Sequence, residues 1–211
     1  WGTSLGAATD SPLELSPVRE RVRQAWSTTT AVNFCAKAYP TVASGHPDNA
    51  PLQVLAGFMR NGYLHRAIRE QGGAYGGGAS QDASSASFRF FSYRDPRLQE
   101  TLADFDAAID WVISSEHKPH QLEEAILGVI ASLDKPASPA GEAKQAYFNR
   151  AFGRTLAHRA QFRKQILSIT TADLKRVAQL YLSPEKASIG IICNKESADS
   201  LKIENLEIVN L

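Results

Sequence analysis

The sequence lacks the features that mark several large classes of protein. No apolar run approaches the 18 residues that suggest a membrane-spanning helix. The 23 basic and 22 acidic residues leave a formal net charge of +1, so no basic surplus points to nucleic acid or to an anionic membrane surface. We therefore expect no nucleic-acid partner and no membrane association.

Cysteine is scarce as well, with two copies, Cys35 and Cys193, and no C-x-x-C motif. Each lies in an apolar, strand-like stretch without the charged neighbours that activate a thiolate. We predict two buried thiols, and a disulfide between them is the less favoured alternative.

Motifs for zinc and nucleotides are missing too. Neither H-x-x-E-H nor H-E-x-x-H occurs in the 211 residues, and G-x-x-x-x-G-K-[ST] is absent. The nearest set of possible metal ligands is His117, His120, Glu123 and Glu124, but Pro119 separates the histidines at a predicted helix start. A solvated loop leading into a helix explains this set better than a metal site does. We predict no metal site in this chain.

The sequence does contain a dense glycine cluster, because five of its 14 glycines lie within positions 72–78. A charged helical pattern precedes the cluster and a polar, strand-like segment follows it. Nucleotide-binding glycine loops have the opposite order, strand before helix, which places the helix N-terminus at the phosphate. A helix C-cap followed by a glycine-rich strand is a second alternative, and it leaves the run from Gly76 to Gly78 unexplained.

Glycine is also used where φ must be positive or where another backbone comes close. Arg69 and Tyr75 flank the cluster, six residues apart. Two strong hydrogen-bond donors therefore lie where the backbone of a ligand could approach.

Hydrophobic periodicity predicts the order strand, helix, two strands, several helices, strand. The first strand is expected over 28–38, and a helix capped by Asp48 or Asn49 runs to residue 69 or 70. A hairpin follows over 75–81 and 86–93. We predict helices starting at Asp95, over 120–133, from a linker at 135–141 to 167, and after the cap formed by Thr170 and Asp173. A strand over 187–193, a short polar helix and a strand-like tail over 208–211 complete the chain.

This order predicts an α+β domain with a largely antiparallel sheet and helices packed on one face. We expect residues 1–25 to be a lead-in or linker from a preceding domain, with a short basic helix over 18–24. Residues 26–211 are expected to be a single domain, and the chain to be a piece of a longer polypeptide.

Residues 68–79, read as Ile-Arg-Glu-Gln-Gly-Gly-Ala-Tyr-Gly-Gly-Gly-Ala, resemble the last homologous domain of the M16 metallopeptidases, in the presequence protease branch. Three further stretches fit the same branch: 25–40, 92–96, and 134–136 together with 138–142. The resemblance covers nearly the whole chain from about Trp26. It implies an M16 metallopeptidase (LuxS/MPP-like) domain, in which a sheet is backed by helices and four such domains enclose a chamber.

The resemblance also implies a function, the degradation of short unstructured peptides by a zinc-dependent peptidase of which this is the C-terminal domain. Zinc would be bound by a missing N-terminal domain, and the partners would be the N-terminal half of the polypeptide and peptide substrates. Carried onto this sequence, the family's catalytic arginine and tyrosine are Arg69 and Tyr75. We expect Tyr75 to stabilise the oxyanion and Arg69 to hold a substrate carbonyl, with Gly76 and Gly77 close to the substrate main chain.

Two alternatives stay open. Arg69 could instead satisfy the dipole of its helix, with Tyr75 packed in the core. The whole chain could belong to a non-catalytic M16-like peptide-binding or structural subunit, and an H-x-x-E-H motif upstream would decide against that. The fragment alone is expected to be inactive. Its compartment would be the cytoplasm in a bacterium and an organelle matrix in a eukaryote.

Overall fold

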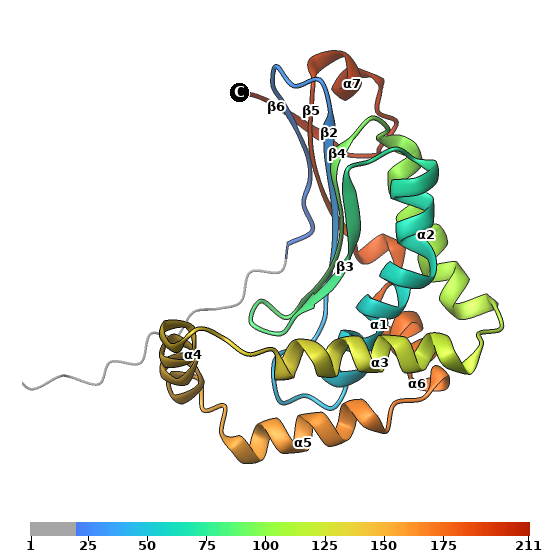
Figure 1. Cartoon of the computed structure of the whole chain (residues 1–211). Helices are drawn as coiled ribbons and strands as arrows, with labels where there is room; N and C mark the ends of the chain where they lie inside the picture. Colours follow the sequence, from blue (N-terminus) through green and yellow to red (C-terminus); the bar gives the residue numbers. More distant parts are fainter. Residues whose placement is uncertain (1–19) are drawn as a thin grey trace, which may run out of the picture.

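The computed structural model describes residues 20–211, and it places six strands in one sheet with most of the helices on one face (Figure 1). The strand order is β3-β4-β2-β5-β1-β6. Neighbours from β3 to β5 pair antiparallel, whereas β1 pairs parallel with both β5 and β6. The predicted α+β fold is confirmed, although its sheet is mixed. The strands are β1 (Arg23–Ser27), β2 (Asn33–Pro40), β3 (Gly76–Asp82), β4 (Ser87–Asp95), β5 (Ser188–Cys193) and β6 (Glu207–Asn210).

The helices carry most of the apolar surface that covers the sheet. They are α1 (Asn49–Met59), a π-helix η1 (Arg60–Gln71), α2 (Gln99–Ser114), α3 (Pro119–Asp134), α4 (Pro139–Ala151), α5 (Leu156–Leu167), α6 (Thr171–Tyr181), a 3-10 turn η2 (Pro184–Lys186) and α7 (Lys195–Ser200). Thr170 and Asp173 form the predicted capping box of α6. In the described part of the chain, no helix is both long enough and apolar enough to cross a bilayer.

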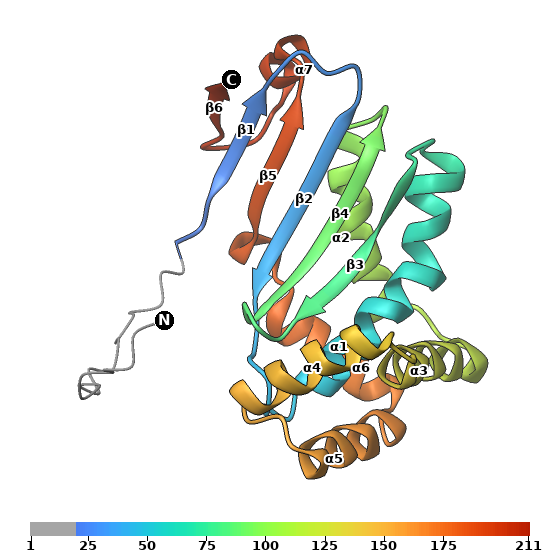
Figure 2. The same cartoon turned by 60° about the vertical axis from the view of Figure 1, so that its left-hand side comes forward.

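Alternation along β4 separates the two faces of the sheet. Phe88 and Phe90 are fully buried under the helices, and Phe90 stacks on Phe105 of α2 with ring centroids 5.4 Å apart. Phe91 and Tyr93 point to the opposite face and are exposed. We call this helix-free side the open face (Figure 2). β4 is an interior strand, as its apolar pattern predicted, but helices cover only one of its sides.

Two helix predictions are wrong in position. α2 begins at Gln99 and not at Asp95, because the Asp95 carboxylate ends β4 and accepts hydrogen bonds from the Arg97 N–H and the Thr101 hydroxyl. The long helix predicted to reach residue 167 is divided into α4 and α5. Gly153 lies between them at a φ of +64°, a conformation that ends a helix.

The first strand prediction also needs correction. Residues 28–32, the first part of the strand predicted over 28–38, form a turn region instead, so that strand begins at Asn33 as β2, and β1 before the turn was not predicted. Arg23 pairs with Ile189, which makes residues 23–27 a sheet strand and not the end of a basic helix over 18–24. The rest of the predicted lead-in, residues 1–19, lies outside the described residues. The division of the chain at residue 25 stays a prediction.

Both cysteines are buried and free, as predicted. Burial raises the pKa of the Cys35 thiol to about 12 and also raises the pKa of Cys193. Both groups are therefore neutral thiols at physiological pH, which makes them poor nucleophiles.

Asp48 precedes α1 as expected, but its side chain does not cap that helix. Its two carboxylate oxygens accept hydrogen bonds from α6 instead, one from the Arg176 guanidinium at 2.6 Å and one from the Tyr181 hydroxyl at 2.8 Å. These bonds tie the start of α1 to α6. The hydrogen bond from Arg176 is the main cause that lowers the pKa of Asp48 below its usual value of 3.8.

We expect Asp48→Asn to lower the free energy of unfolding by about 1 kcal/mol at pH 7, since Arg176 is half-exposed and the pair is partly screened. Because the pKa is depressed in the folded state, the stabilisation is complete above the unfolded value and is lost as the pH falls through the folded value. Urea unfolding between pH 2 and pH 7 measures this. The exposed Asp199→Asn is the control, and an equal effect of the two changes would contradict the prediction.

Candidate functional site

The candidate site lies where η1 ends and the chain turns into the edge strand β3. Gly73 adopts a φ of +78°, and the backbone N–H groups of Gly73 and Ala74 donate to the carbonyls of Arg69 and Ile68, each at 3.1 Å. The N–H of Tyr75 then donates to the carbonyl of Arg94 at the end of β4, at 3.2 Å. Both predicted site residues therefore stand on backbone that is hydrogen-bonded on either side of the turn. π-helical turns such as those of η1 are frequent at functional sites.

The side chains of Arg69 and Tyr75 at this turn are exposed to solvent. Tyr75 is 65% exposed and Arg69 is exposed. Within residues 20–211 neither side chain takes part in a hydrogen bond or ion pair, and the Tyr75 ring contacts the Tyr93 ring edge-on, with centroids 5.4 Å apart. Tyr75 is therefore not packed in the core, whereas Arg69 lies in the last turn of η1, where a favourable interaction with the helix dipole stays open. The catalytic roles of the two residues stay predictions.

The glycines make this backbone geometry possible. A Cβ on Gly77 would lie 2.8 Å from Ile68 Cγ2, so the glycine lets η1 approach β3 closely. A Cβ on Gly72 would lie 1.9 Å from an Arg97 guanidinium nitrogen and 2.5 Å from the Ile68 carbonyl oxygen. A Cβ on Gly76 would come no closer than 3.8 Å to Tyr93. Packing thus explains Gly72 and Gly77, while the substrate approach predicted for Gly76 and Gly77 stays a prediction.

Arg97 is a residue of this site that the sequence did not reveal. Its Nη2 donates to the carbonyl of Ala67 at 3.1 Å and to Asp104 at 2.9 Å, so it joins η1 to the start of α2. No local pattern marks this role, because Ala67 is 30 positions away in the sequence. Tyr93, whose ring contacts the Tyr75 ring, could have been found from the sequence, because the apolar alternation of β4 predicts the face on which it lies.

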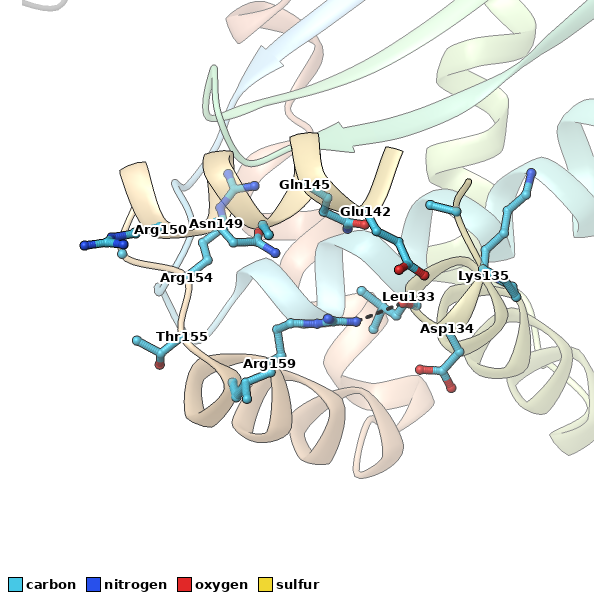
Figure 3. Close-up of a pocket in the computed structure, with 15 residues that line it drawn as sticks. Leu133, Asp134, Lys135, Glu142, Gln145, Asn149, Arg150, Arg154, Thr155 and Arg159 are labelled. Atoms are coloured by element: carbon cyan, nitrogen blue, oxygen red, sulfur yellow. Dashed lines mark hydrogen bonds between the residues drawn. The ribbon is translucent and has the colours of Figure 1, made fainter. Parts of the chain in front are cut away.

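Two clefts lie elsewhere, along α3, α4 and α5. Figure 3 shows the first, of about 740 Å³, in which Arg159 reaches from α5 to the carbonyl of Leu133 at 3.2 Å. The second, of about 720 Å³, extends to the tip of the β3–β4 hairpin, and both include Arg154. Neither includes Arg69 or Tyr75. The side chains of Arg69 and Tyr75 are exposed at the surface, outside both of these clefts.

The described residues do not fit a zinc site. Among residues 20–211, no three His, Cys, Asp or Glu side chains come together in a way that could hold a metal. His117 is engaged in packing, with its ring 4.6 Å from Trp111 and 5.0 Å from Phe58, and one ring nitrogen bonded to the Val112 carbonyl. His120 is exposed at the start of α3.

Comparison with known proteins agrees with this fold. Residues 23–194 match the family model described as the PreP C-terminal domain. The chain is 42% identical over 151 residues to "Presequence protease, mitochondrial" of Yarrowia lipolytica. The aligned residues make up 72% of this chain and 15% of that protein. The mouse protein of the same name is 34% identical over 160 residues, or 76% of the chain and 15% of its own length.

Among solved structures, a protease from Helicobacter pylori has the same fold, with a TM-score of 0.69 at 15% identity. The match covers 84% of this chain and 45% of that one. The chain thus spans about 15% of the length of the curated relatives it matches. Because the family model covers most of the sequence, we conclude that this chain belongs to the PreP C-terminal domain family of the M16 peptidases.

Proposed function

We propose that this chain is the C-terminal domain of a zinc-dependent peptidase that degrades short unstructured peptides, and that it is inactive alone. It supplies Tyr75 and Arg69 to a catalytic site that the N-terminal half of the polypeptide completes. The observation that carries the proposal is that both side chains are exposed and, within residues 20–211, make no hydrogen bond or ion pair, on a backbone that is hydrogen-bonded on either side of the turn. Such donors can bind a substrate without first breaking a hydrogen bond or ion pair of their own.

The chemistry follows from the two donor types. When water attacks a peptide carbonyl, negative charge develops on the carbonyl oxygen. The Tyr75 hydroxyl donates a hydrogen bond to that oxygen, and the Arg69 guanidinium donates to a neighbouring carbonyl of the peptide main chain. Zinc, which activates water and polarises carbonyls in such enzymes, would be held outside this chain.

The edge strand β3 gives the peptide a second place to bind. It pairs with β4 on one side and, in the described part of the chain, with no strand on the other. An extended peptide can add to such an edge through main-chain hydrogen bonds. Gly76 begins this strand directly after Tyr75, so a bound peptide would pass close to the hydroxyl.

The mitochondrial relatives favour an organelle matrix as the compartment for a eukaryotic source.

The test uses the full-length polypeptide loaded with zinc and a quenched fluorescent peptide. We expect Arg69→Ala to lower kcat/KM by about 10- to 100-fold, mainly by raising KM, because a charged hydrogen bond to the substrate is lost. Arg66→Ala is the matched control, since Arg66 is also exposed on η1 and carries the same charge. Equal effects of the two changes would mean that Arg69 acts only through its positive charge and not through a specific hydrogen bond to the substrate.

A further inference from the structure

One row of apolar side chains crosses the open face of the sheet and ends at Tyr75. Trp26 of β1 pairs directly with Ile192 of β5, which pairs directly with Phe34 of β2. The Phe34 ring lies 5.7 Å from the Tyr93 ring of β4, which in turn contacts Tyr75. We call Trp26, Ile192, Phe34 and Tyr93 the apolar row. It lies towards the end of the sheet at which the arrows of β1, β4 and β5 terminate (Figure 2).

The apolar row points away from the core. Trp26, Ile192 and Tyr93 are 37%, 42% and 43% exposed, and they alternate with buried residues such as Ala25 and Cys193. Directly paired residues lie on the same face of a sheet, so the row is contiguous. A contiguous exposed apolar patch marks a binding surface more often than scattered apolar residues do.

Open space lies beside the row. The next pair on the open face is Gly190 of β5 with Ala36 of β2. A Cβ on Gly190 would meet no atom within 4 Å. Ile192 and Phe34 therefore border a part of the surface where an incoming side chain can lie against them without displacing anything.

We propose that the apolar row is a subsite for an apolar or aromatic side chain of the substrate peptide. This inference rests on the proposed function, because the peptide is placed by its scissile carbonyl at Tyr75. The row spans three strand spacings, or roughly 14 Å, which an extended peptide covers with about four residues. A peptide that leaves the β3 edge at Tyr75 and crosses the strands over the open face can therefore place a side chain over the row, up to several residues away from the scissile bond.

The contact between Tyr75 and Tyr93 argues for a peptide and against a folded domain as the occupant. The two rings touch edge-on, so a domain lying flat over Tyr93 would also cover Tyr75. An extended peptide passes over both rings and brings its own carbonyl to the hydroxyl. The exposed 65% of Tyr75 is the surface that this arrangement uses.

The test uses the full-length, zinc-loaded polypeptide and pairs of quenched peptides that carry Phe or Ala at one position, scanned along the peptide. In the wild type we expect Phe to raise kcat/KM about tenfold at one position or more within about five residues of the cleaved bond. Ile192→Thr removes apolar contact and Gly190→Val fills the open space. Each should reduce this Phe/Ala ratio by about threefold to tenfold, mainly through KM.

Ile208→Thr is the matched control, because Ile208 is 40% exposed on β6 and is not a member of the row. Its Phe/Ala ratio should equal that of the wild type. If Tyr75→Phe abolishes turnover while both row variants keep the wild-type ratio, the row is not a subsite and the proposed function stands. If Ile192→Thr slows all peptides equally and lowers the thermal midpoint, the row packs on another part of the polypeptide, and the inference is overturned.

A labelling experiment tests the row without catalysis. Ile192→Cys is introduced into the full-length polypeptide, zinc is removed to prevent cleavage, and the rate of maleimide addition at position 192 is read by mass spectrometry. We expect a Phe-containing peptide to slow the labelling more than its Ala counterpart does, even if Tyr75→Phe proves to have normal turnover. Labelling that is blocked without any peptide would show that the row is covered, and would overturn the inference.

Discussion

In the full-length, zinc-loaded polypeptide, Tyr75→Phe is expected to lower kcat by about 100- to 1000-fold and to change KM little. The substitution removes one hydroxyl from a ring that is held edge-on by Tyr93, so the ring itself should stay in place. A donor that acts only on the charge of the transition state affects kcat and kcat/KM alike. The expected size is that of removing one oxyanion donor from other enzymes. Steady-state cleavage of a quenched peptide, with zinc content checked in parallel, measures it.

Tyr147→Phe is the control for this experiment. It deletes a hydroxyl from another exposed tyrosine, whose ring also contacts an aromatic neighbour edge-on, Phe148 at 5.6 Å, and which lies on α4 away from Tyr75, so its turnover should stay within about twofold of the wild type. Unchanged turnover of Tyr75→Phe would return Tyr75 to a packing role and remove the oxyanion assignment. If the wild type cleaves no peptide with any metal, the non-catalytic peptide-binding subunit becomes the better account of the chain.

Local patterns were enough to predict most elements of the fold. The glycine pair after η1, the capping box at Thr170 and Asp173, and the alternation of β4 each act within a few residues, and the structure contains what they predict. Predictions failed where distant partners decide. Asp95 reads as a helix cap but ends a strand, because Asn33 of β2, far back in the sequence, pairs with it across the sheet. Likewise, β1 is a strand because β5 and β6, far along the chain, pair with it.

The residues of the candidate site also divide into those that the sequence could single out and those that it could not. Arg69 and Tyr75 could be singled out because they flank an unusual glycine cluster, and the resemblance to the M16 peptidases gave them roles. The support around them could not be read from spacing alone. Arg97 reaches Ala67 across 30 positions, and the contact of Tyr75 with Tyr93 depends on the pairing of β3 with β4. The apolar row is equally invisible in sequence, since the register of three strand pairs brings its members together.

Gly72→Ala is expected to lower kcat/KM by about 100-fold and the free energy of unfolding by about 1–3 kcal/mol. The added Cβ would lie 2.5 Å from the carbonyl oxygen of Ile68, so the end of η1 must shift. It would also lie 1.9 Å from the Arg97 guanidinium, which must leave the Ala67 carbonyl or Asp104. Arg69 and Tyr75 stand on either side of this glycine, and a shift of about 1 Å in a catalytic group can cost 100-fold in rate.

Gly128→Ala on the exposed side of α3 is the matched control, because its Cβ would meet nothing within 4 Å. That change should raise the free energy of unfolding by about 0.5–1 kcal/mol, as alanine does in a helix, and leave kcat/KM unchanged. Combining Gly72→Ala with Arg97→Ala identifies the cause of the damage. If the Arg97 clash dominates, the double variant is more stable than the sum of the two single losses predicts, whereas strict additivity assigns the loss to the Ile68 carbonyl. A Gly72→Ala protein that behaves like Gly128→Ala would mean that the helix end accommodates a methyl group, and that the glycine is not what positions Arg69 and Tyr75.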